Sequence, residues 1–504
     1  MKKYSFTLLL MSLLLASCGG ETPSSVVPSS TSPSSESPSS EVISSEPSSE
    51  SITPSSEASS QAPISSELPP SSESSSAPSS EEPAPTEQVT VKIATVTIDK
   101  FDVTLDYSDE YFDQASNVFN KDLMMISFGL NSSSDSKDEI EKNFNSIGLT
   151  NHLFVGYDEE FSKDSFGFGI GSKELKDNRL LVFFSPRGFQ YHSEWANNFT
   201  IGKEGNHEGF NECANKALES LKTYLSDYPE KEIVLWFTGF SRGGGIANLL
   251  SNFVLNDNEL NIDEAHLYTY TFEAPAGLAV ENYQGYDSVF NIITGGDFVP
   301  LIPPYEYGLV REGNDVIIDT SILDVDKIVK EFSDKINLPA FVTSSESDPQ
   351  NEIEFANWIV SQLLVEYEEE DKGINTRTKY VNNAQGPATY LLDLFFRLKS
   401  STLTAIIDYV KAQVKESPIE FVFSILVEDG LFNALNPFIK EDGVVYDEED
   451  LRTNCNAGVK VIGEVGAAPA LKLYTNGTYT NALRMFYFHF PEVIYNIYLN
   501  FDIN

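Results

Sequence analysis

Short apolar runs alternate with amphipathic segments along the chain beyond residue 88. Four of these runs have the length and the β-branched or aromatic content of buried strands: Leu180–Phe184, Ile233–Phe237, Leu267–Phe272 and Val289–Ile293. Two stretches between them, Phe210–Leu225 and Ile246–Val254, repeat apolar residues at helical spacing. Buried strands that alternate with amphipathic helices predict an α/β fold, with a mostly parallel sheet covered by helices on both faces.

The segments that flank this pattern predict other elements. Residues 89–107 alternate apolar and polar positions, which indicates a strand or a hairpin, and Phe112–Phe128 predicts a helix. From residue 321 to about 480 apolar residues fall on helical faces, so we predict a largely helical insertion there, followed by a terminal core segment over 481–504. The inserted helices would form either a cap over a site in the 89–320 core or a structural domain beside the sheet.

The N-terminus has the pattern of an export signal. Lys2 and Lys3 precede an apolar run from Phe6 to Leu15, which is too short to span a bilayer. Small residues then lead to Cys18 and Gly19, as in the lipobox of bacterial lipoproteins. We predict a lipoprotein signal peptide over residues 1–17, with lipid on Cys18 as the membrane anchor and an extracytoplasmic location. The alternative is an ordinary secretory signal that ends in cysteine.

Residues 18–88 consist mostly of serine, proline and glutamate, and such a composition cannot bury enough apolar area to fold. We predict a disordered tether, acting as a stalk or as a simple spacer. The whole chain carries a formal net charge of −43, which argues against a nucleic-acid partner and against attraction to an anionic membrane surface. Beyond Cys18 only Cys213 and Cys455 remain, too few for a disulfide framework; they would either pair or stay as isolated thiols.

A Gly-x-Ser-x-Gly motif stands between the second buried run and the helix that follows it. Gly239, Ser241 and Gly243 form the motif, and its strand–turn–helix setting is far more specific than the five letters alone. A serine at such a tight turn projects its hydroxyl outward, and the two elbow glycines leave room for the turn. We therefore predict Ser241 to be a nucleophile. The alternative is a glycine-rich turn that binds an anion at the helix N-terminus.

A serine nucleophile needs a base, and the base needs an orienting acid. Asp297 follows the fourth buried run, so it should lie at the sheet edge from which Ser241 emerges. Of the five histidines, only His489 comes after Asp297, as the order of an α/β-hydrolase triad requires. The alternatives are an aspartate that caps a turn and a histidine packed among aromatic rings.

Several segments, found in order along the chain, resemble the class 3 lipases, the fungal-type triacylglycerol lipase family. They are Phe184–Phe189, His207–Phe210, Gly239–Gly244, Glu273–Pro275 and Asp297–Pro304. The resemblance covers roughly residues 180–313 together with the C-terminal histidine segment.

This resemblance implies an α/β-hydrolase-like fold with Ser241, Asp297 and His489 as the triad. It also implies oxyanion-hole donors from the amide of Arg242 and from that of Gly188 or Phe189. The chain departs from the family at Arg242, where leucine is frequent, and at Phe189, where threonine or serine is usual. The second departure leaves a backbone amide as the donor.

Carboxylic-ester hydrolysis, with lipid esters as substrates, is the function that these residues favour. Two alternatives keep the same fold: a non-catalytic binding lipoprotein on the cell surface, and an acyltransferase that uses the same triad. We expect no cofactor and no metal, because the sequence has neither a nucleotide loop nor a cluster of metal ligands.

Overall fold

The computed structural model describes residues 86–94, 100–157, 166–188, 200–202, 204–297, 299–303, 307–320, 364–372, 375–382, 398–443, 447–465 and 488–501, with residues 194, 197, 198, 323 and 327. The predicted signal peptide, Cys18 and the tether lie outside the described residues. Phe189 and much of the predicted insertion also lie outside them.

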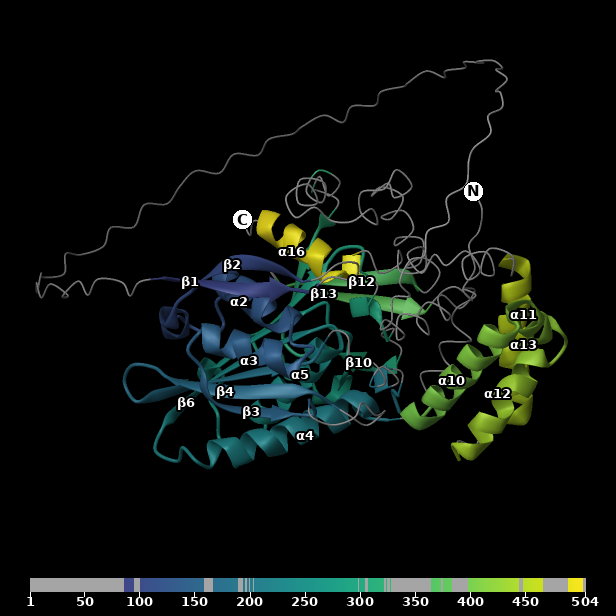
Figure 1. The fold of residues 1–504 in the computed structure, drawn as a ribbon, viewed down its shortest axis with the longest axis horizontal. Helices are drawn as coiled ribbons and strands as arrows, with labels where there is room; N and C mark the ends of the chain where they lie inside the picture. The colour runs from purple at the N-terminus through teal and green to yellow at the C-terminus, as the bar shows by residue number, and fades with distance from the viewer. Residues whose placement is uncertain are drawn as a thin grey trace, which may run out of the picture. The chain divides into compact units, whose positions relative to one another are not determined.

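A seven-stranded sheet forms the centre of the fold (Figure 1). In their order across the sheet its strands are β11 (Asn314–Ile318), β9 (Val289–Thr294), β7 (Leu267–Phe272), β6 (Glu232–Phe240), β5 (Arg179–Pro186), β4 (Phe168–Glu174) and β3 (Thr150–Val155). The first five are parallel to one another, and β4 and β3 continue the sheet in antiparallel pairing. The predicted mostly parallel sheet is therefore confirmed.

The alternation of side chains along each strand explains why the sheet is covered on both faces. In β5, Leu181 and Phe183 belong to one buried cluster, whereas Val182 and Phe184 belong to another. The first cluster includes residues of α2 (Lys121–Ser132), α3 (Lys137–Ser146) and α16 (Pro491–Asn500). The second includes residues of α4 (Glu208–Leu225) and α5 (Arg242–Leu255). A continuous apolar strand is what such two-sided burial requires.

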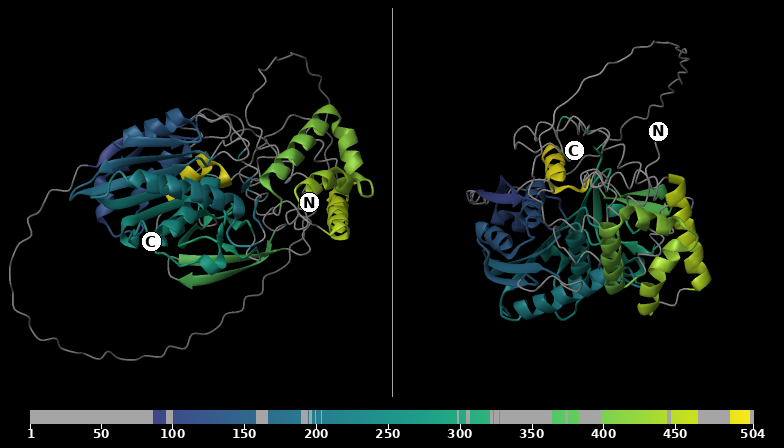
Figure 2. Two further views of the ribbon diagram at one scale, coloured as in Figure 1. Left: turned by 90° about the horizontal axis from the view of Figure 1, so that it is seen from below. Right: turned by 45° about the vertical axis from the view of Figure 1, so that its right-hand side comes forward.

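The C-terminal helix returns to the beginning of the described chain. In Figures 1 and 2, α16 lies beside the hairpin of β1 (Glu87–Ile93) and β2 (Phe101–Tyr107). The rings of Phe101 and Tyr495 meet edge to face with centroids 6.1 Å apart. The ring of Phe128 on α2 reaches Phe272 on β7 at 5.1 Å and Tyr498 on α16 at 5.3 Å. One aromatic cluster thus joins α2, the sheet and the segment that carries His489.

The structure corrects the prediction of a single helix over Phe112–Phe128. The chain first forms a short 3-10 helix, η1 (Asp109–Asp113), and α2 starts only at Lys121. Each has its own N-cap: the Ser108 hydroxyl accepts a hydrogen bond from the amide of Glu110, and the Asn120 side chain accepts one from the amide of Leu123. The hairpin predicted over residues 89–107 is present as β1 and β2.

The region after residue 320 contains two groups of elements. One is an antiparallel hairpin, β12 (Leu364–Lys372) with β13 (Asn375–Asn382), which the helical prediction did not include. The other is a set of helices, α10 (Ser400–Glu416), α11 (Pro418–Leu426), α12 (Gly430–Glu441) and α13 (Glu448–Val465). Leu403, Leu431 and Leu435 are among the buried residues of this set. Whether it is a cap stays a prediction.

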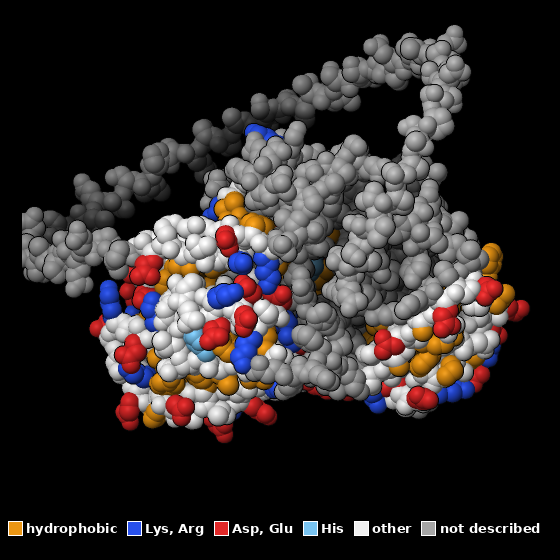
Figure 3. Space-filling view, viewed as in Figure 1, with side chains coloured by type: hydrophobic (Ala, Val, Ile, Leu, Met, Phe, Trp, Pro, Cys, Tyr) orange, Lys and Arg blue, Asp and Glu red, His pale blue; other side chains and the backbone are white. Residues whose placement is uncertain are grey.

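Three further observations bear on the predictions. Cys213 and Cys455 are both buried, and neither forms a disulfide. In the part of the chain described here, no helix combines the length and apolarity needed to cross a bilayer. Figure 3 shows acidic side chains spread over the described part of one face, with lysine and arginine between them, rather than gathered in a single patch.

We expect Phe128→Ala to lower the free energy of unfolding by about 3–5 kcal/mol, because the ring is fully buried at the junction of α2, the sheet and α16. Urea unfolding followed by tryptophan fluorescence measures the change. The matched control is Val118→Ala, whose side chain is 56% exposed and should alter stability by less than about 0.5 kcal/mol. Equal effects of the two substitutions would contradict this account of the core.

Candidate active site

Ser241 occupies the tight turn between β6 and α5. Its backbone has φ 54° and ψ −127°, in the region that side-chain-bearing residues rarely adopt. A Cβ on Gly239 would lie 2.3 Å from the carbonyl oxygen of Gly243, so the turn closes only with glycine there. The amide of Ser241 donates to the carbonyl of Phe272 at 2.8 Å, which attaches the turn to the end of β7.

The structure brings Ser241, His489 and Asp297 into one hydrogen-bonded line. His489 Nε2 lies 2.8 Å from Ser241 Oγ, and His489 Nδ1 lies 2.5 Å from Asp297 Oδ2. The other carboxylate oxygen of Asp297 accepts a hydrogen bond of 2.9 Å from the amide of Val299. Asp297 and Ser241 are buried, with 3% and 7% exposure. Both carboxylate oxygens of Asp297 are therefore held by a contact, and the group faces the His489 ring from a position shielded from water.

Different elements deliver these three side chains to one edge of the sheet. Ser241 follows β6 and Asp297 follows β9, and because these strands are parallel both residues emerge at their carboxyl ends. His489 comes from the turn that leads into α16. The ring of Phe240 stacks on the imidazole with centroids 5.0 Å apart. A Cβ on Gly296, which has φ +95°, would strike the ring of Phe488, so the acid loop lies tightly against the histidine segment.

A second buried carboxyl group, Glu273, lies behind the acid and was missed from the sequence. Its side chain accepts hydrogen bonds from the amide and hydroxyl of Thr294 on β9, and from the hydroxyl of Tyr498 on α16 at 2.8 Å. Glu273 thereby ties the strand before Asp297 to the helix after His489. Burial, and then the negative charge of Asp297, raise the pKa of Glu273 well above its usual range. In the sequence Glu273 stood in one of the resembling segments, Glu273–Pro275, but no role was predicted for its carboxyl group.

Gly188, predicted to help form the oxyanion hole, lies directly against the elbow. A Cβ on this residue would be 2.0 Å from the carbonyl oxygen of Phe240, and a Cβ on Gly243 would be 3.2 Å from the Cα of Gly188. The amide of Arg242, the other predicted donor that the structure describes, begins α5. Both segments that were predicted to supply oxyanion-hole amides therefore flank Ser241. Of the three predicted donor residues, Phe189 lies outside the described residues.

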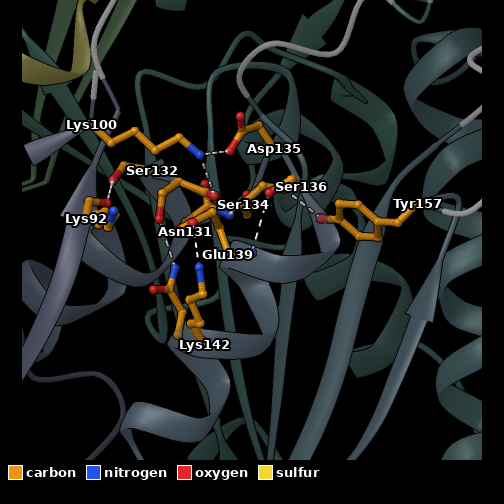
Figure 4. A network of polar contacts seen from close by, with 12 residues as sticks. Lys92, Lys100, Asn131, Ser132, Ser134, Asp135, Ser136, Glu139, Lys142 and Tyr157 are labelled. Carbon is orange, nitrogen blue, oxygen red and sulfur yellow. Dashed lines mark hydrogen bonds and ion pairs between the residues drawn. The ribbon is translucent and has the colours of Figure 1, made fainter. Parts of the chain in front are cut away.

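Polar side chains at the end of α2 hold the chain just before Gly188. Asn131 Nδ2 donates to the carbonyl of Pro186 at 2.8 Å, and the Ser134 hydroxyl donates to the same carbonyl at 3.1 Å. Figure 4 shows Asn131, Ser134 and Tyr157 within a wider network of polar contacts, in which the Tyr157 hydroxyl donates to the carbonyl of Ser134 at 2.7 Å. The end of β5 is thus anchored by residues far from it in sequence.

His207, in the second of the resembling segments, has a structural position. It caps the N-terminus of α4, stacks on Phe210 with ring centroids 3.9 Å apart, and contacts the carbonyl of Asn198 through Nε2 at 3.0 Å. Burial lowers the pKa of His207 to about 4. The imidazole is therefore neutral at physiological pH. Across the described ranges, no group of acidic, histidine and cysteine residues has the arrangement of a metal site.

The fold and this arrangement together define an α/β-hydrolase-type protein with a Ser–His–Asp constellation at the carboxyl edge of its sheet. Comparison with known families gives a match to the family model described as Lipase (class 3), over residues 173–307. This range includes Gly188, Ser241 and Asp297, which supports the resemblance to class 3 lipases. His489 lies outside it, so its place in the site rests on the geometry alone.

Parts of the chain are also similar to individual known proteins. The chain is 27% identical over 213 residues to secreted mono- and diacylglycerol lipase 1 of Fusarium solani, an alignment that covers 38% of this chain and 63% of that protein. Among solved structures, the native Rhizomucor miehei lipase propeptide complex aligns at 16% identity with a TM-score of 0.32, covering 43% of this chain and 71% of that one. The lipase of Rhizopus microsporus var. chinensis aligns at 14% identity with a TM-score of 0.31, over 42% and 76% of the two chains.

The buried state of His207 predicts a pH dependence of stability. Because its folded pKa of about 4 is below the usual 6.5, the unfolded chain takes up a proton first as the pH falls. The contribution of neutral His207 to the free energy of unfolding is fully present above pH 6.5. It is lost as the pH falls toward 4, and its size is on the order of 3 kcal/mol for a pKa shift of this size. His207→Asn, which keeps an N-cap acceptor, should reduce the slope of unfolding free energy against pH in this window. The half-exposed His266→Asn is the control, and an equal slope in all three proteins would refute the assignment.

Proposed function

We propose that this protein is a serine hydrolase that cleaves carboxylic esters of lipids through an acyl-enzyme on Ser241. The observation that carries the proposal is the continuous hydrogen-bonded line from Ser241 Oγ through the His489 ring to Asp297. A serine hydroxyl is inert without such a base, and the base needs the acid to hold its tautomer and orientation. The strained turn at Ser241 supports the same role, because it holds the hydroxyl at the end of the line.

In the proposed reaction, Ser241 Oγ attacks the carbonyl carbon of the ester while its proton passes to His489 Nε2. The new C–O bond forms as the carbonyl π bond opens to an oxyanion. When the oxyanion collapses, the bond to the alcohol breaks, and His489 returns the proton to the leaving oxygen. Water then attacks the acyl-Ser241 ester in the same way, with His489 as base, and the carboxylic acid and free Ser241 are released. Asp297 would hold the ring in place and stabilise the imidazolium.

The oxyanion would be bound by backbone amides on either side of Ser241. We assign these donors to Arg242 and to Gly188 or Phe189. The close approach of Gly188 to Phe240 supports this assignment, since it holds the end of β5 against the elbow. Donors held in this way stabilise charge that appears only in the transition state.

We infer acylglycerols as the substrate class, and an extracytoplasmic enzyme anchored through Cys18 as its setting. The mono- and diacylglycerol lipase named above supports the first inference, although this chain spans only 63% of that protein's length. The lipobox-like sequence at Cys18 and the Ser/Pro/Glu-rich tether support the second. The helices after residue 398 would cover bound acyl chains if they form the predicted cap.

The decisive test of the nucleophile is covalent labelling. A fluorophosphonate probe should label the purified protein, and Ser241→Ala should abolish both labelling and ester hydrolysis. Ser251→Ala is the matched control, since Ser251 is a second buried hydroxyl on α5 and bonds only within the core, to Ala247 and Thr269. Labelling that persists in Ser241→Ala would overturn the proposal.

The same purified protein tests the substrate class. Initial rates on a short-chain nitrophenyl ester, on monoacylglycerol and diacylglycerol, and on a triacylglycerol emulsion should favour the acylglycerols. Activity confined to the water-soluble ester would reject the lipid assignment and leave a serine esterase. Labelling without hydrolysis of any ester, but with acyl transfer to an added alcohol, would favour the acyltransferase instead.

The orienting acid gives an independent prediction. Asp297→Asn keeps the size of the side chain but removes its charge, so we expect kcat to fall by on the order of 10³–10⁴-fold while KM changes little. Steady-state kinetics on one ester measures both constants. Asp263→Asn, at a 3-10 helix N-cap before the start of β7, should leave them unchanged. A loss of less than tenfold in Asp297→Asn would mean that another group orients His489.

A further inference from the structure

Two arginines and one glutamate meet in the interior beside the elbow. Arg187 Nη2 forms an ion pair with one carboxylate oxygen of Glu194, and Arg242 Nη1 lies 3.0 Å from the other. All three side chains are at most 1% exposed. Burying three charges costs several kcal/mol each unless they are closely paired, and such clusters are poor sources of stability. Their presence here therefore calls for another explanation.

The positions of the two arginines along the chain supply that explanation. Arg187 directly precedes Gly188 at the end of β5, and Arg242 directly follows Ser241 at the start of α5. These are the two segments whose amides would bind the oxyanion. One carboxylate, from Glu194, joins both of them. The bridge thus links the end of β5 to the start of α5, at the point where their relative position would set the distance between the donor amides.

Each guanidinium group is also held on its other sides. Arg187 donates to the carbonyl of Gly156 at 3.3 Å and lies over the ring of Tyr157, 4.9 Å from its centroid. Arg242 lies over the ring of Phe166, 5.4 Å from its centroid. Planar guanidinium groups held by an ion pair and an aromatic ring have little freedom to move. The cluster is therefore suited to fix geometry rather than to bind and release a partner.

We propose that Glu194 is a positioning residue, whose carboxylate sets the spacing of the oxyanion-hole amides through Arg187 and Arg242. The proposal rests on the function proposed above. The cluster carries a formal charge of +1, which also favours a developing oxyanion in a low-dielectric interior. Asn131 and Ser134 donate to the carbonyl of Pro186, so the segment that bears Gly188 is also held at a second point.

The first variant is Glu194→Gln, which retains the shape of the side chain but loses its charge. We expect kcat for an ester to fall about 10- to 100-fold with KM within about twofold, because the lost interaction acts only on the transition state. The inhibition constant of an alkylboronic acid, whose anionic adduct on serine resembles the tetrahedral intermediate, should rise by a similar factor. Glu194→Asp, which keeps the charge, should recover part of both losses.

Glu194→Gln removes the negative charge that both buried arginines contact and could unfold the protein. A second variant, Arg242→Leu, avoids this problem because it leaves the neutral Arg187–Glu194 pair. It should also lower kcat and weaken boronate binding. Titration with the fluorophosphonate gives the fraction of active sites, so that all constants refer to folded enzyme. Asp257→Asn, which breaks the ion pair with Lys222 on α4, is the control and should change neither constant.

The outcomes separate this proposal from the one on which it rests. If the unmodified protein is labelled at Ser241 and hydrolyses esters, and if kcat falls and the boronate constant rises together, the role of Glu194 is supported. If the unmodified protein is active but Arg242→Leu and folded Glu194→Gln keep both constants within twofold, the role of Glu194 is overturned and the triad stands. If the unmodified protein neither labels nor hydrolyses, both proposals fail.

Discussion

The turn at Ser241 is the constraint on which the rest of the site depends. Its positive φ is stable only because the neighbouring structure leaves no alternative: glycine at 239 and 243 allows the close approach, and the hydrogen bond to Phe272 fixes the amide. A turn this tight brings the end of β5 within contact of the elbow at Gly188. The strain at one residue thus determines where the hydroxyl points and where the neighbouring strand must end.

The central part of the fold could be predicted because both faces of the sheet are buried. Such strands are continuous apolar runs, and β5, β6, β7 and β9 are all of this kind. The strands β3 and β4, which follow β5 across the sheet, were missed because β3 is at most half-buried, whereas β4 contains Gly169 and Gly171, which remove the apolar pattern. The helix over Phe112–Phe128 was mispredicted because spacing alone does not reveal the caps at Ser108 and Asn120.

In the site, the residues that belong to motifs could be predicted from the sequence. The buried residues that hold these motifs in place could not. Ser241 and Asp297 each follow a recognisable strand, and His489 was reached by its order in the chain. The structure brings these three together. Glu273 stands in one of the resembling segments and Glu194 in none, and only the folded chain shows that each joins two segments of the site. A sequence pattern reveals residues that repeat at a fixed spacing or belong to a motif. It does not reveal residues that contact each other only because the folded chain brings them together.

The two buried glutamates differ in a way that follows from their surroundings. Glu273 faces Asp297, a like charge, and its hydrogen-bond donors are neutral hydroxyl and amide groups, so burial favours its protonated form. Glu194 faces two guanidinium groups, one on each of its carboxylate oxygens. The raised pKa of Glu273 disfavours a second negative charge beside Asp297, whose carboxylate contacts the His489 ring. The cluster at Glu194 places net positive charge near the elbow, where the proposed oxyanion forms. The site therefore places the Asp297 carboxylate beside the His489 ring and two guanidinium groups near the elbow, the polarity that the proposed transfer of the Ser241 proton to His489 would require.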